Sequence, residues 1–177
     1  MNRYTTAAIA TIALSGSIYV AKHLESCDTL TLHPKHNLYC IKVKARDTIR
    51  NPILADLVIA QAILESNLGG KPSGLALKGN NLFGIKGKGT CGSIKMQTWE
   101  VIRGKKVTVM ADFAKFCTLE DGLQKRKAMF DLPRYKNLYQ ATSFEDAANR
   151  IRKSGYATDP AYSKKLVEIY NEYIKNK

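Results

Sequence analysis

Residues 53–64 are almost all apolar, and this run is the strongest pattern in the chain. Asn51 and Pro52 stand directly before it, as the N-cap and the first residue of a helix commonly do. A helix over this run has apolar side chains around most of its circumference, and a helix of that kind is buried. The pattern therefore predicts a buried helix that begins at Pro52.

A β-hairpin is expected further along the chain. Residues 94–102 and 107–113 are rich in Val, Ile, Thr and aromatic residues, a composition typical of strands. Between them, Arg103-Gly104-Lys105 offers a short turn with a residue that tolerates positive φ. We expect two antiparallel strands joined at this turn.

Helix boundaries mark the C-terminal third. Thr118–Asp121 resembles a capping box at the start of a helix, which assigns Asp121 to capping. Gly155 fits the position just after a helix that begins near Phe144, and Asp159-Pro160 fits the N-cap and first residue of a final helix. A chain of 177 residues leaves room for about one such domain.

Glu65 stands where the apolar run meets a glycine-rich break, Leu64-Glu65-Ser66-Asn67-Leu68-Gly69. If Gly69 or Gly70 ends the helix, Glu65 lies in its last turn, where the helix dipole and low-polarity neighbours both disfavour an ionised carboxylate. A carboxyl group that keeps its proton can donate it to the departing oxygen of a glycosidic bond. The alternative is a surface Glu near a helix end.

Two further segments join Leu64–Gly69 in a recognisable order: Asn80-Asn81-Leu82-Phe83-Gly84-Ile85-Lys86 and Tyr156-Ala157-Thr158-Asp159-Pro160-Ala161-Tyr162. Together they resemble the glucosaminidase domain of glycoside hydrolase family 73, over about residues 50 to 177. The motif in Leu64–Gly69 also occurs in lytic transglycosylases and goose-type lysozymes, so the resemblance rests on the order and spacing of all three segments. The chain departs from the family at Phe113–Phe116, where Phe-Arg-x-Tyr is common.

The resemblance implies a fold, an activity and a catalytic residue. The fold is mainly α and lysozyme-like (α+β), a helical core with a small β-hairpin lobe bordering a substrate groove. The activity is hydrolysis of the β-1,4 bond between N-acetylglucosamine and N-acetylmuramic acid, with the catalytic Glu at the position of Glu65. The resemblance implies no metal and no organic cofactor.

Glu100 is the candidate for a second carboxylate, because Thr98-Trp99-Glu100 resembles the family's Thr-x-Glu element on the hairpin. A water-activating base would stand about 6.5–9.5 Å from Glu65, and a nucleophile about 5–5.5 Å. The substrate's 2-acetamido group could also attack, with Glu100 only stabilising it. The structural alternative is a solvated strand Glu. Asp112 and Glu120 are weaker candidates.

Five residues are predicted to bind substrate, each with a structural alternative. Tyr156 can pack its ring on a sugar and bind the acetamido group, and Tyr162 is balanced between contact and core packing. The Asn81 amide can donate to an N-acetyl carbonyl, whereas Phe83 either floors the groove or anchors the loop beneath it. Trp99, the single tryptophan, can stack on a sugar or fill the buried face of the hairpin.

The N-terminal part of the chain predicts export. Residues 4–21 carry no charge and precede Lys22, so we expect residues 1–22 to be a signal peptide or an uncleaved signal anchor with transient membrane association. A buried N-terminal helix is the third interpretation. Residues 23–50 are expected to be a polar approach segment, and residues 51–177 the catalytic domain. The expected location is the periplasm or cell wall, or a virion.

Four cysteines, at 27, 40, 91 and 117, agree with an oxidising compartment. Pairing Cys27 with Cys40 would close a small loop, and pairing Cys91 with Cys117 would join the ends of the hairpin. Four cysteines allow three pairings, and the sequence leaves them open. A zinc site formed by Cys27, Cys40 and the histidines at 33 and 36 is a further alternative, although its spacing matches no common ligand pattern.

The net charge of +13, from 28 Lys and Arg against 15 Asp and Glu, favours anionic partners. Peptidoglycan glycan strands and an anionic wall or membrane surface fit this charge. The basic residues are dispersed without a nucleic-acid-binding motif, so no nucleic-acid partner is expected. We expect a monomer that hydrolyses peptidoglycan as an endo-β-N-acetylglucosaminidase, in the role of a phage lysin or a bacterial autolysin. There are two alternatives. One is a lytic transglycosylase or muramidase that uses Glu65 alone, and the other is a non-catalytic wall-binding or virion structural protein.

Overall fold

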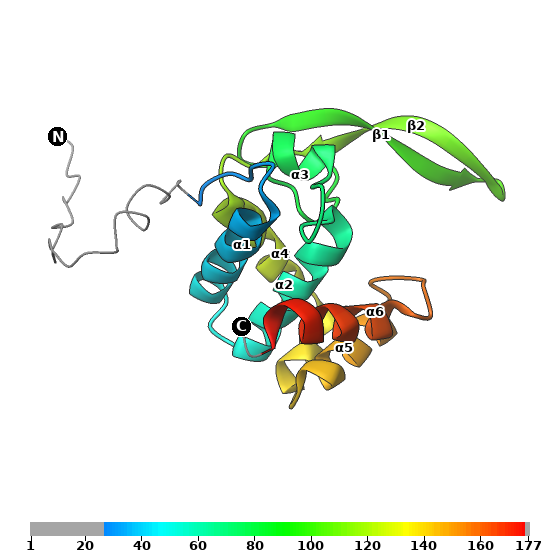
Figure 1. Ribbon diagram of the computed structural model, residues 1–177. Coiled ribbons are helices and arrows are strands. Elements are labelled where there is room, and N and C mark those ends of the chain that lie inside the picture. The colour runs from blue at the N-terminus through cyan, green and yellow to red at the C-terminus, as the bar shows by residue number, and fades with distance from the viewer. Residues whose placement is uncertain (1–26, 176–177) are drawn as a thin grey trace, which may run out of the picture.

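The computed structural model describes residues 27–175, except for the side chains of residues 100–102. A helical body carries one long β-hairpin that projects from it (Figure 1). The body comprises α1 (Pro34–Thr48), α2 (Pro52–Ser66), α3 (Gly74–Gly79), α4 (Leu119–Phe130), the 3-10 helix η1 (Pro133–Gln140), α5 (Phe144–Lys153), α6 (Tyr162–Ile169) and the π-helical turn η2 (Tyr170–Ile174). The hairpin consists of β1 (Ser93–Ile102) and β2 (Lys105–Ala114).

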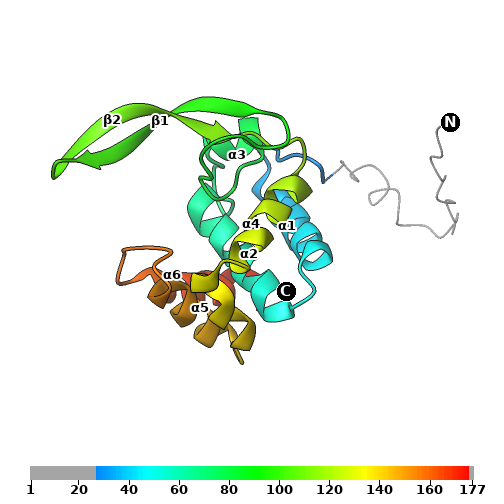
Figure 2. The same ribbon diagram turned by 180° about the vertical axis from the view of Figure 1, so that it is seen from behind.

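The predicted buried helix is confirmed as α2, which lies among the other helices (Figures 1 and 2). Asn51 is its N-cap, and the Asn51 side chain accepts a hydrogen bond of 3.1 Å from the backbone N–H of Leu54. Residues 57–63 are buried without interruption, because α1, α5, α6 and η2 pack around the helix. Its apolar surface on all sides thus determines what the rest of the body must cover.

The helix α2 ends earlier than its glycines suggest. Asn67, rather than Gly69 or Gly70, takes the left-handed conformation that stops it, with φ 54° and ψ 42°. Asn tolerates this conformation better than other non-glycine residues, and its side-chain amide donates to the carbonyl of Lys71 at 2.9 Å. Gly69 serves close packing, since a Cβ there would lie 2.7 Å from the hydroxyl of Tyr173. Glu65 still falls in the last turn, as predicted.

The predicted hairpin is confirmed, with a tighter turn than expected. The strands pair antiparallel from Ser93 opposite Ala114 to Ile102 opposite Lys105. Only Arg103 and Gly104 form the turn, with φ of 50° and 76°. Two residues of positive φ match the right-handed twist of paired strands, which is why such two-residue turns are common in hairpins.

A disulfide between Cys91 and Cys117 ties the two ends of the hairpin to each other, with Cα atoms 5.1 Å apart. The backbone N–H of Cys91 also donates to the carbonyl of Lys115 at 2.9 Å. The hairpin is therefore anchored covalently at its base.

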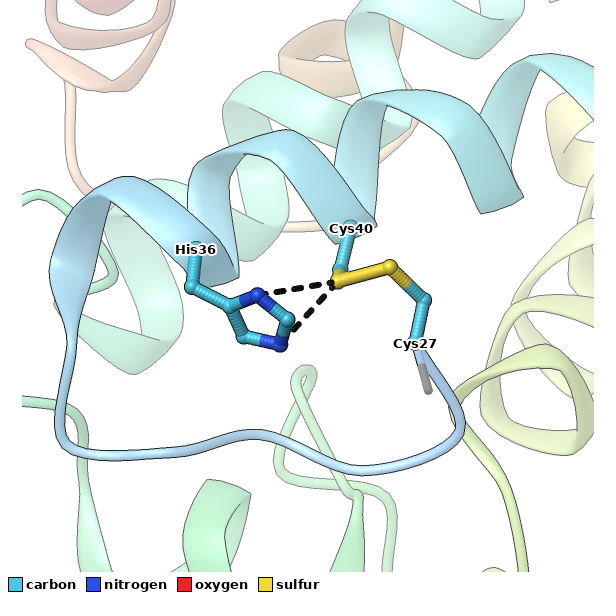
Figure 3. Close-up of side chains that lie close together, drawn as sticks. All are labelled: Cys27, His36 and Cys40. Carbon is cyan, nitrogen blue, oxygen red and sulfur yellow. Dashed lines mark hydrogen bonds between the residues drawn. A yellow bond between two sulfur atoms is a disulfide. The ribbon is translucent and has the colours of Figure 1, made fainter. Parts of the chain in front are cut away.

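The second disulfide joins Cys27 to Cys40 on α1 (Figure 3). Because the two sulfur atoms are bonded to each other, neither is a thiolate that could hold zinc, and the alternative of a zinc site is wrong for this oxidised state. The ring of His36 lies beside this bond, with Nε2 3.4 Å from Sγ of Cys40. His33 stands apart as the exposed N-cap residue of α1.

The prediction of a polar approach segment over residues 23–50 is wrong for residues 34–48, which form α1. Its inner face, with Cys40, Ile41 and Ala45 fully buried, packs on α2 and α4. Lys42 and Lys44 between these positions obscure the helical period in the sequence. The packed body therefore begins before residue 51.

The predicted signal peptide or anchor in residues 1–22, with its apolar residues 4–21, lies outside the described residues. Within residues 27–175, none of the helices has the length and apolar character needed to cross a bilayer.

The predicted capping box at the start of α4 is confirmed. The backbone N–H of Asp121 donates to Oγ1 of Thr118 at 3.2 Å, and the backbone N–H of Thr118 donates to Oδ2 of Asp121 at 3.1 Å. The hydroxyl of Thr90 also donates to this oxygen, at 2.8 Å. The Thr90 hydrogen bond is the largest cause that lowers the pKa of the Asp121 carboxyl, and Thr118 adds to it.

We expect Asp121→Asn to lower the free energy of unfolding by about 1 kcal/mol at pH 7, the usual size of a capping interaction. A lowered folded-state pKa stabilises the fold above the unfolded value of about 3.9, and this contribution disappears as the pH falls through the folded value. Urea unfolding of wild type and variant at pH 7 and near pH 2.5 measures the difference, with Glu120→Gln as a control. An equal difference at both pH values would contradict the assignment.

Removal of the hairpin disulfide by Cys91→Ala with Cys117→Ala should lower the free energy of unfolding by about 3 kcal/mol, because the bond closes a loop of 26 residues in the unfolded chain. Urea unfolding of the oxidised wild type and the double variant measures this loss. Unchanged stability would show that the bond adds nothing beyond the strand pairing.

Candidate active site

A cleft of about 660 Å³ opens at the C-terminal end of α2. Three segments far apart in sequence form it, namely the end of α2, the loop after α3, and the link between α5 and α6 together with the first turn of α6. Its lining residues are Leu64, Glu65, Phe83, Tyr156, Ala157, Thr158, Asp159, Tyr162 and Lys165. Four residues that the sequence singled out, Glu65, Phe83, Tyr156 and Tyr162, are thus brought together.

Glu65 extends from the last turn of α2 with an exposed side chain. The hydroxyl of Tyr162 donates to its Oε1 at 2.9 Å. The low-polarity surroundings expected from the sequence are not found, because the end of α2 opens into the cleft and the nearest wall presents a polar hydroxyl. Among the described residues, the second carboxyl oxygen, Oε2, has no hydrogen-bond donor. Since Glu65 lines the cleft, this oxygen is free to bond a molecule that enters it.

Tyr162 is buried, and its hydroxyl makes two hydrogen bonds. It accepts one from Nε2 of Gln61 at 3.1 Å and donates the other to Glu65. Burial raises the pKa of the Tyr162 hydroxyl, and the charge of Glu65 raises it further. The group therefore keeps its proton at any physiological pH. Tyr162 was expected to contact substrate or to pack in the core, and the structure shows a further contact, in which its hydroxyl holds Glu65.

Tyr156 lies half-buried beside Tyr162, with ring centroids 5.7 Å apart. The end of α5 directs it there: the N–H of Gly155 donates to the carbonyl of Arg152 at 2.9 Å, and the N–H of Tyr156 donates to that of Ile151 at 3.3 Å. These bonds form a Schellman motif around Gly155, whose φ is 74°. The predicted role of Gly155 is confirmed. Burial raises the pKa of the Tyr156 hydroxyl.

The final helix starts two residues later than predicted, at Tyr162 rather than Pro160. Asp159 caps a turn instead, because its Oδ1 accepts from the N–H of Ala161 at 2.8 Å. Its Oδ2 accepts from Nζ of Lys165 at 2.7 Å, across the mouth of the cleft. The hydrogen bond from Lys165 lowers the pKa of the Asp159 carboxyl.

Asn81 is buried beneath the cleft rather than within it. Its amide nitrogen donates to the carbonyls of Ile85 at 2.8 Å and Ala114 at 2.9 Å, and its Oδ1 accepts from the N–H of Ile85 at 3.0 Å. Both amide hydrogens are used, so none remains for an N-acetyl carbonyl. Asn81 joins its loop to the base of the hairpin. Phe83, nearly buried, supplies part of the floor of the cleft.

The hairpin carries the remaining two candidates. Trp99 has 62% of its side chain exposed, so the interpretation that it fills a buried face is wrong. Nζ of Lys106 lies 5.0 Å from its ring, a cation–π contact, and Trp99 is not among the residues lining the cleft. Glu100 pairs with Val107 in the backbone register, and its side chain lies outside the described residues. Its catalytic role stays a prediction.

Two buried polar residues behind the cleft were missed by sequence reasoning. Arg126 on α4 is fully buried, and its Nη2 donates to Oε1 of Gln61 on α2 at 2.7 Å. Burial lowers the pKa of the Arg126 guanidinium. The available signal was a polar residue inside each apolar pattern: Gln61 interrupts the buried run of α2, and Arg126 lies on the buried face of α4 with Leu123 and Phe130.

Comparison with known proteins gives consistent results. The glucosaminidase family model, described as mannosyl-glycoprotein endo-beta-N-acetylglucosaminidase, matches residues 34–175. The exo-glucosaminidase LytG of Bacillus subtilis is 39% identical over 127 residues, which are 68% of this chain and 44% of LytG. The chain thus spans less than half the length of that relative.

Solved structures agree in fold. The catalytic domain of the autolysin Auto from Listeria monocytogenes matches with a TM-score of 0.69 and 30% identity, over 82% of this chain and 86% of that one. A truncated glycoside hydrolase domain of FlgJ from Salmonella typhimurium matches with a TM-score of 0.60 and 28% identity, over 79% and 97%.

The predicted mainly α, lysozyme-like fold with a small β-hairpin lobe is confirmed by these structures. The three segments that suggested the resemblance all fall inside the residues that the family model matches. The chain therefore belongs to the glucosaminidase family, glycoside hydrolase family 73.

Proposed function

We propose that this protein hydrolyses peptidoglycan as a β-N-acetylglucosaminidase, with Glu65 as the general acid. One observation carries the proposal: an exposed carboxyl at the head of an open cleft, with one oxygen held by a tyrosine hydroxyl 2.9 Å away. The carboxyl is thereby oriented before substrate arrives, which is what acid catalysis on a glycoside requires. The matching family and the names of the relatives support this substrate class.

The reaction needs a proton at the departing oxygen and a nucleophile at the sugar's anomeric carbon. Because Oε1 of Glu65 accepts from Tyr162, the proton for transfer is carried by the other carboxyl oxygen, Oε2. Water activated by Glu100, or the substrate's own acetamido group, supplies the nucleophile.

Sugar binding is proposed along the wall formed by Tyr156 and Phe83. A half-buried ring with a polar hydroxyl can pack on a sugar face and bind its acetamido group. The hairpin and the α5–α6 link project from the same side of the body (Figures 1 and 2), so a glycan strand lying in the cleft would pass beneath the hairpin. Trp99 and Glu100 lie on that arm.

The proposed place of action is the cell wall, on glycan strands. The net charge of +13 favours encounter with an anionic wall or membrane surface. Two disulfides fit an exported protein. Export or tethering through residues 4–21, and action as a monomer, complete the proposal.

Glu65→Gln should abolish glycan cleavage, since an amide cannot deliver the proton while the side chain keeps its size. Wild type and variant are incubated with peptidoglycan, and the products are reduced with borohydride and identified by mass spectrometry. We expect reduced N-acetylglucosamine ends with the wild type and none with the variant. Glu168→Gln, a surface carboxylate on α6, is the matched control and should be fully active.

Each other outcome selects an alternative. Reduced N-acetylmuramic acid ends would identify a muramidase, and 1,6-anhydro ends a lytic transglycosylase. If neither protein produces new ends, the chain is a wall-binding protein. New ends at equal rates with wild type and Glu65→Gln would remove Glu65 from the chemistry.

Tyr156→Phe and Tyr156→Ala separate the two parts of the proposed sugar contact. Loss of the hydroxyl alone should raise KM about threefold to tenfold, as expected for one neutral hydrogen bond. Loss of the ring should raise KM further, because the stacking surface is removed. Steady-state rates on soluble glycan fragments measure both. If both variants kept the wild-type KM, Tyr156 would have a packing role only.

A further inference from the structure

A continuous line of hydrogen bonds runs from the buried core to the carboxyl of Glu65. Arg126 donates through Nη2 to Oε1 of Gln61 at 2.7 Å, and Gln61 donates through Nε2 to the hydroxyl of Tyr162 at 3.1 Å. Tyr162 then donates to Oε1 of Glu65 at 2.9 Å. Three helices contribute to it, α4, α2 and α6. Of these four residues, only Glu65 has an exposed side chain.

The guanidinium of Arg126 fixes which group donates and which accepts in every hydrogen bond of the line. Arg carries only N–H donors, so the atom of Gln61 that faces Arg126 must be the carbonyl oxygen. The other end of the same amide is then an NH₂ group, and it must donate to Tyr162. A side-chain amide on its own can rotate by half a turn and exchange these roles. Arg126 removes that freedom.

The hydroxyl of Tyr162 has one hydrogen. Because its oxygen already accepts from Gln61, that hydrogen is directed to Glu65. Were the Gln61 amide reversed, its carbonyl would compete for the same hydrogen, and Glu65 would lose its donor. The orientation of the buried Gln61 amide therefore decides whether Glu65 receives the hydrogen bond from Tyr162.

The surroundings of Arg126 fit a positioning role better than a role in charge pairing. No carboxylate among the described residues forms a salt bridge with it, and its Nε and Nη1 have no hydrogen-bond partner there. Aromatic rings enclose the guanidinium instead. Cζ of Arg126 lies 4.5 Å from the ring centroid of Phe130, 4.7 Å from that of Tyr156 and 5.8 Å from that of Phe83. Among the described residues, its hydrogen-bond partner is Gln61.

We propose that Arg126 is a positioning residue of the active site, which orients the Gln61 amide so that Tyr162 donates its hydrogen to Glu65. This inference rests on the proposed role of Glu65 as the general acid. Neither Arg126 nor Gln61 touches the substrate in this account. Their effect reaches the reaction only through the Tyr162 hydroxyl, and that restriction makes the proposal testable.

The first test compares Arg126→Lys with Arg126→Met, two unbranched side chains of similar length. Lys offers only donors and preserves the direction of the line, whereas Met offers none. We expect Arg126→Met to lower kcat about tenfold with KM within twofold of wild type, because the held carboxyl matters in the transition state. Arg126→Lys should keep kcat within about threefold. Thermal unfolding of each variant verifies that it is folded.

Gln61→Glu provides a second variant that keeps the pairing with Arg126 while removing the donor. A carboxylate at this position accepts only, so it takes the hydrogen of Tyr162 away from Glu65. We expect kcat to fall about tenfold, to the level of Tyr162→Phe, in a folded protein. Wild-type kcat in this variant would overturn the proposal.

The decisive measurement repeats Arg126→Met in a Tyr162→Phe background. If Arg126 acts only through the Tyr162 hydroxyl, the second substitution lowers kcat no further. A second tenfold loss of kcat would show that Arg126 acts by another route and would overturn the inference. The proposed function would still stand in that case, provided that Glu65→Gln is inactive. Full activity of Glu65→Gln would overturn the proposed function itself. The two failures are therefore distinguishable.

Discussion

The apolar surface of α2 is the constraint on which the rest of the structure depends. A helix that is apolar on all sides must be enclosed, and here α1, α5, α6 and η2 enclose it along its length. Its C-terminal turn opens into the cleft, and Glu65 lies in that turn. The carboxyl is consequently carried by a helix whose residues 57–63 are buried without interruption. A site mounted on an enclosed helix holds its geometry better than one mounted on a loop.

The same enclosure explains why polar groups are found inside the core. Gln61 is buried within α2 and Arg126 is buried against it, although burial of each carries a desolvation cost. Their mutual hydrogen bond of 2.7 Å offsets part of this cost. A core made only of apolar residues would enclose α2 equally well, but it could not reach the Tyr162 hydroxyl. The hydrogen bonds that satisfy Gln61 and Arg126 in the core thus also position the Tyr162 hydroxyl beside Glu65.

The features that sequence reasoning predicted are those that depend on near neighbours. The N-cap at Asn51, the hairpin, the Thr118 capping box and the glycine after α5 all rest on residues within a few positions of one another. Such local signals are legible because each has a fixed spacing and a specific residue type. The placement of Glu65 in the last turn of α2 follows from them.

What could not be predicted depends on contacts between distant segments. Asn81 was expected to meet substrate, because a sequence does not show that its amide is used up by Ile85 and Ala114. The exposure of Glu65 and Trp99 likewise depends on what packs nearby. The partnership of Glu65 with Tyr162 spans 97 positions of the chain. Because Glu65 comes from α2 and Tyr162 from α6, the carboxyl acquires its partner only once the segments between them have folded, so a fragment that stops before α6 would present the acid without the hydroxyl that holds it.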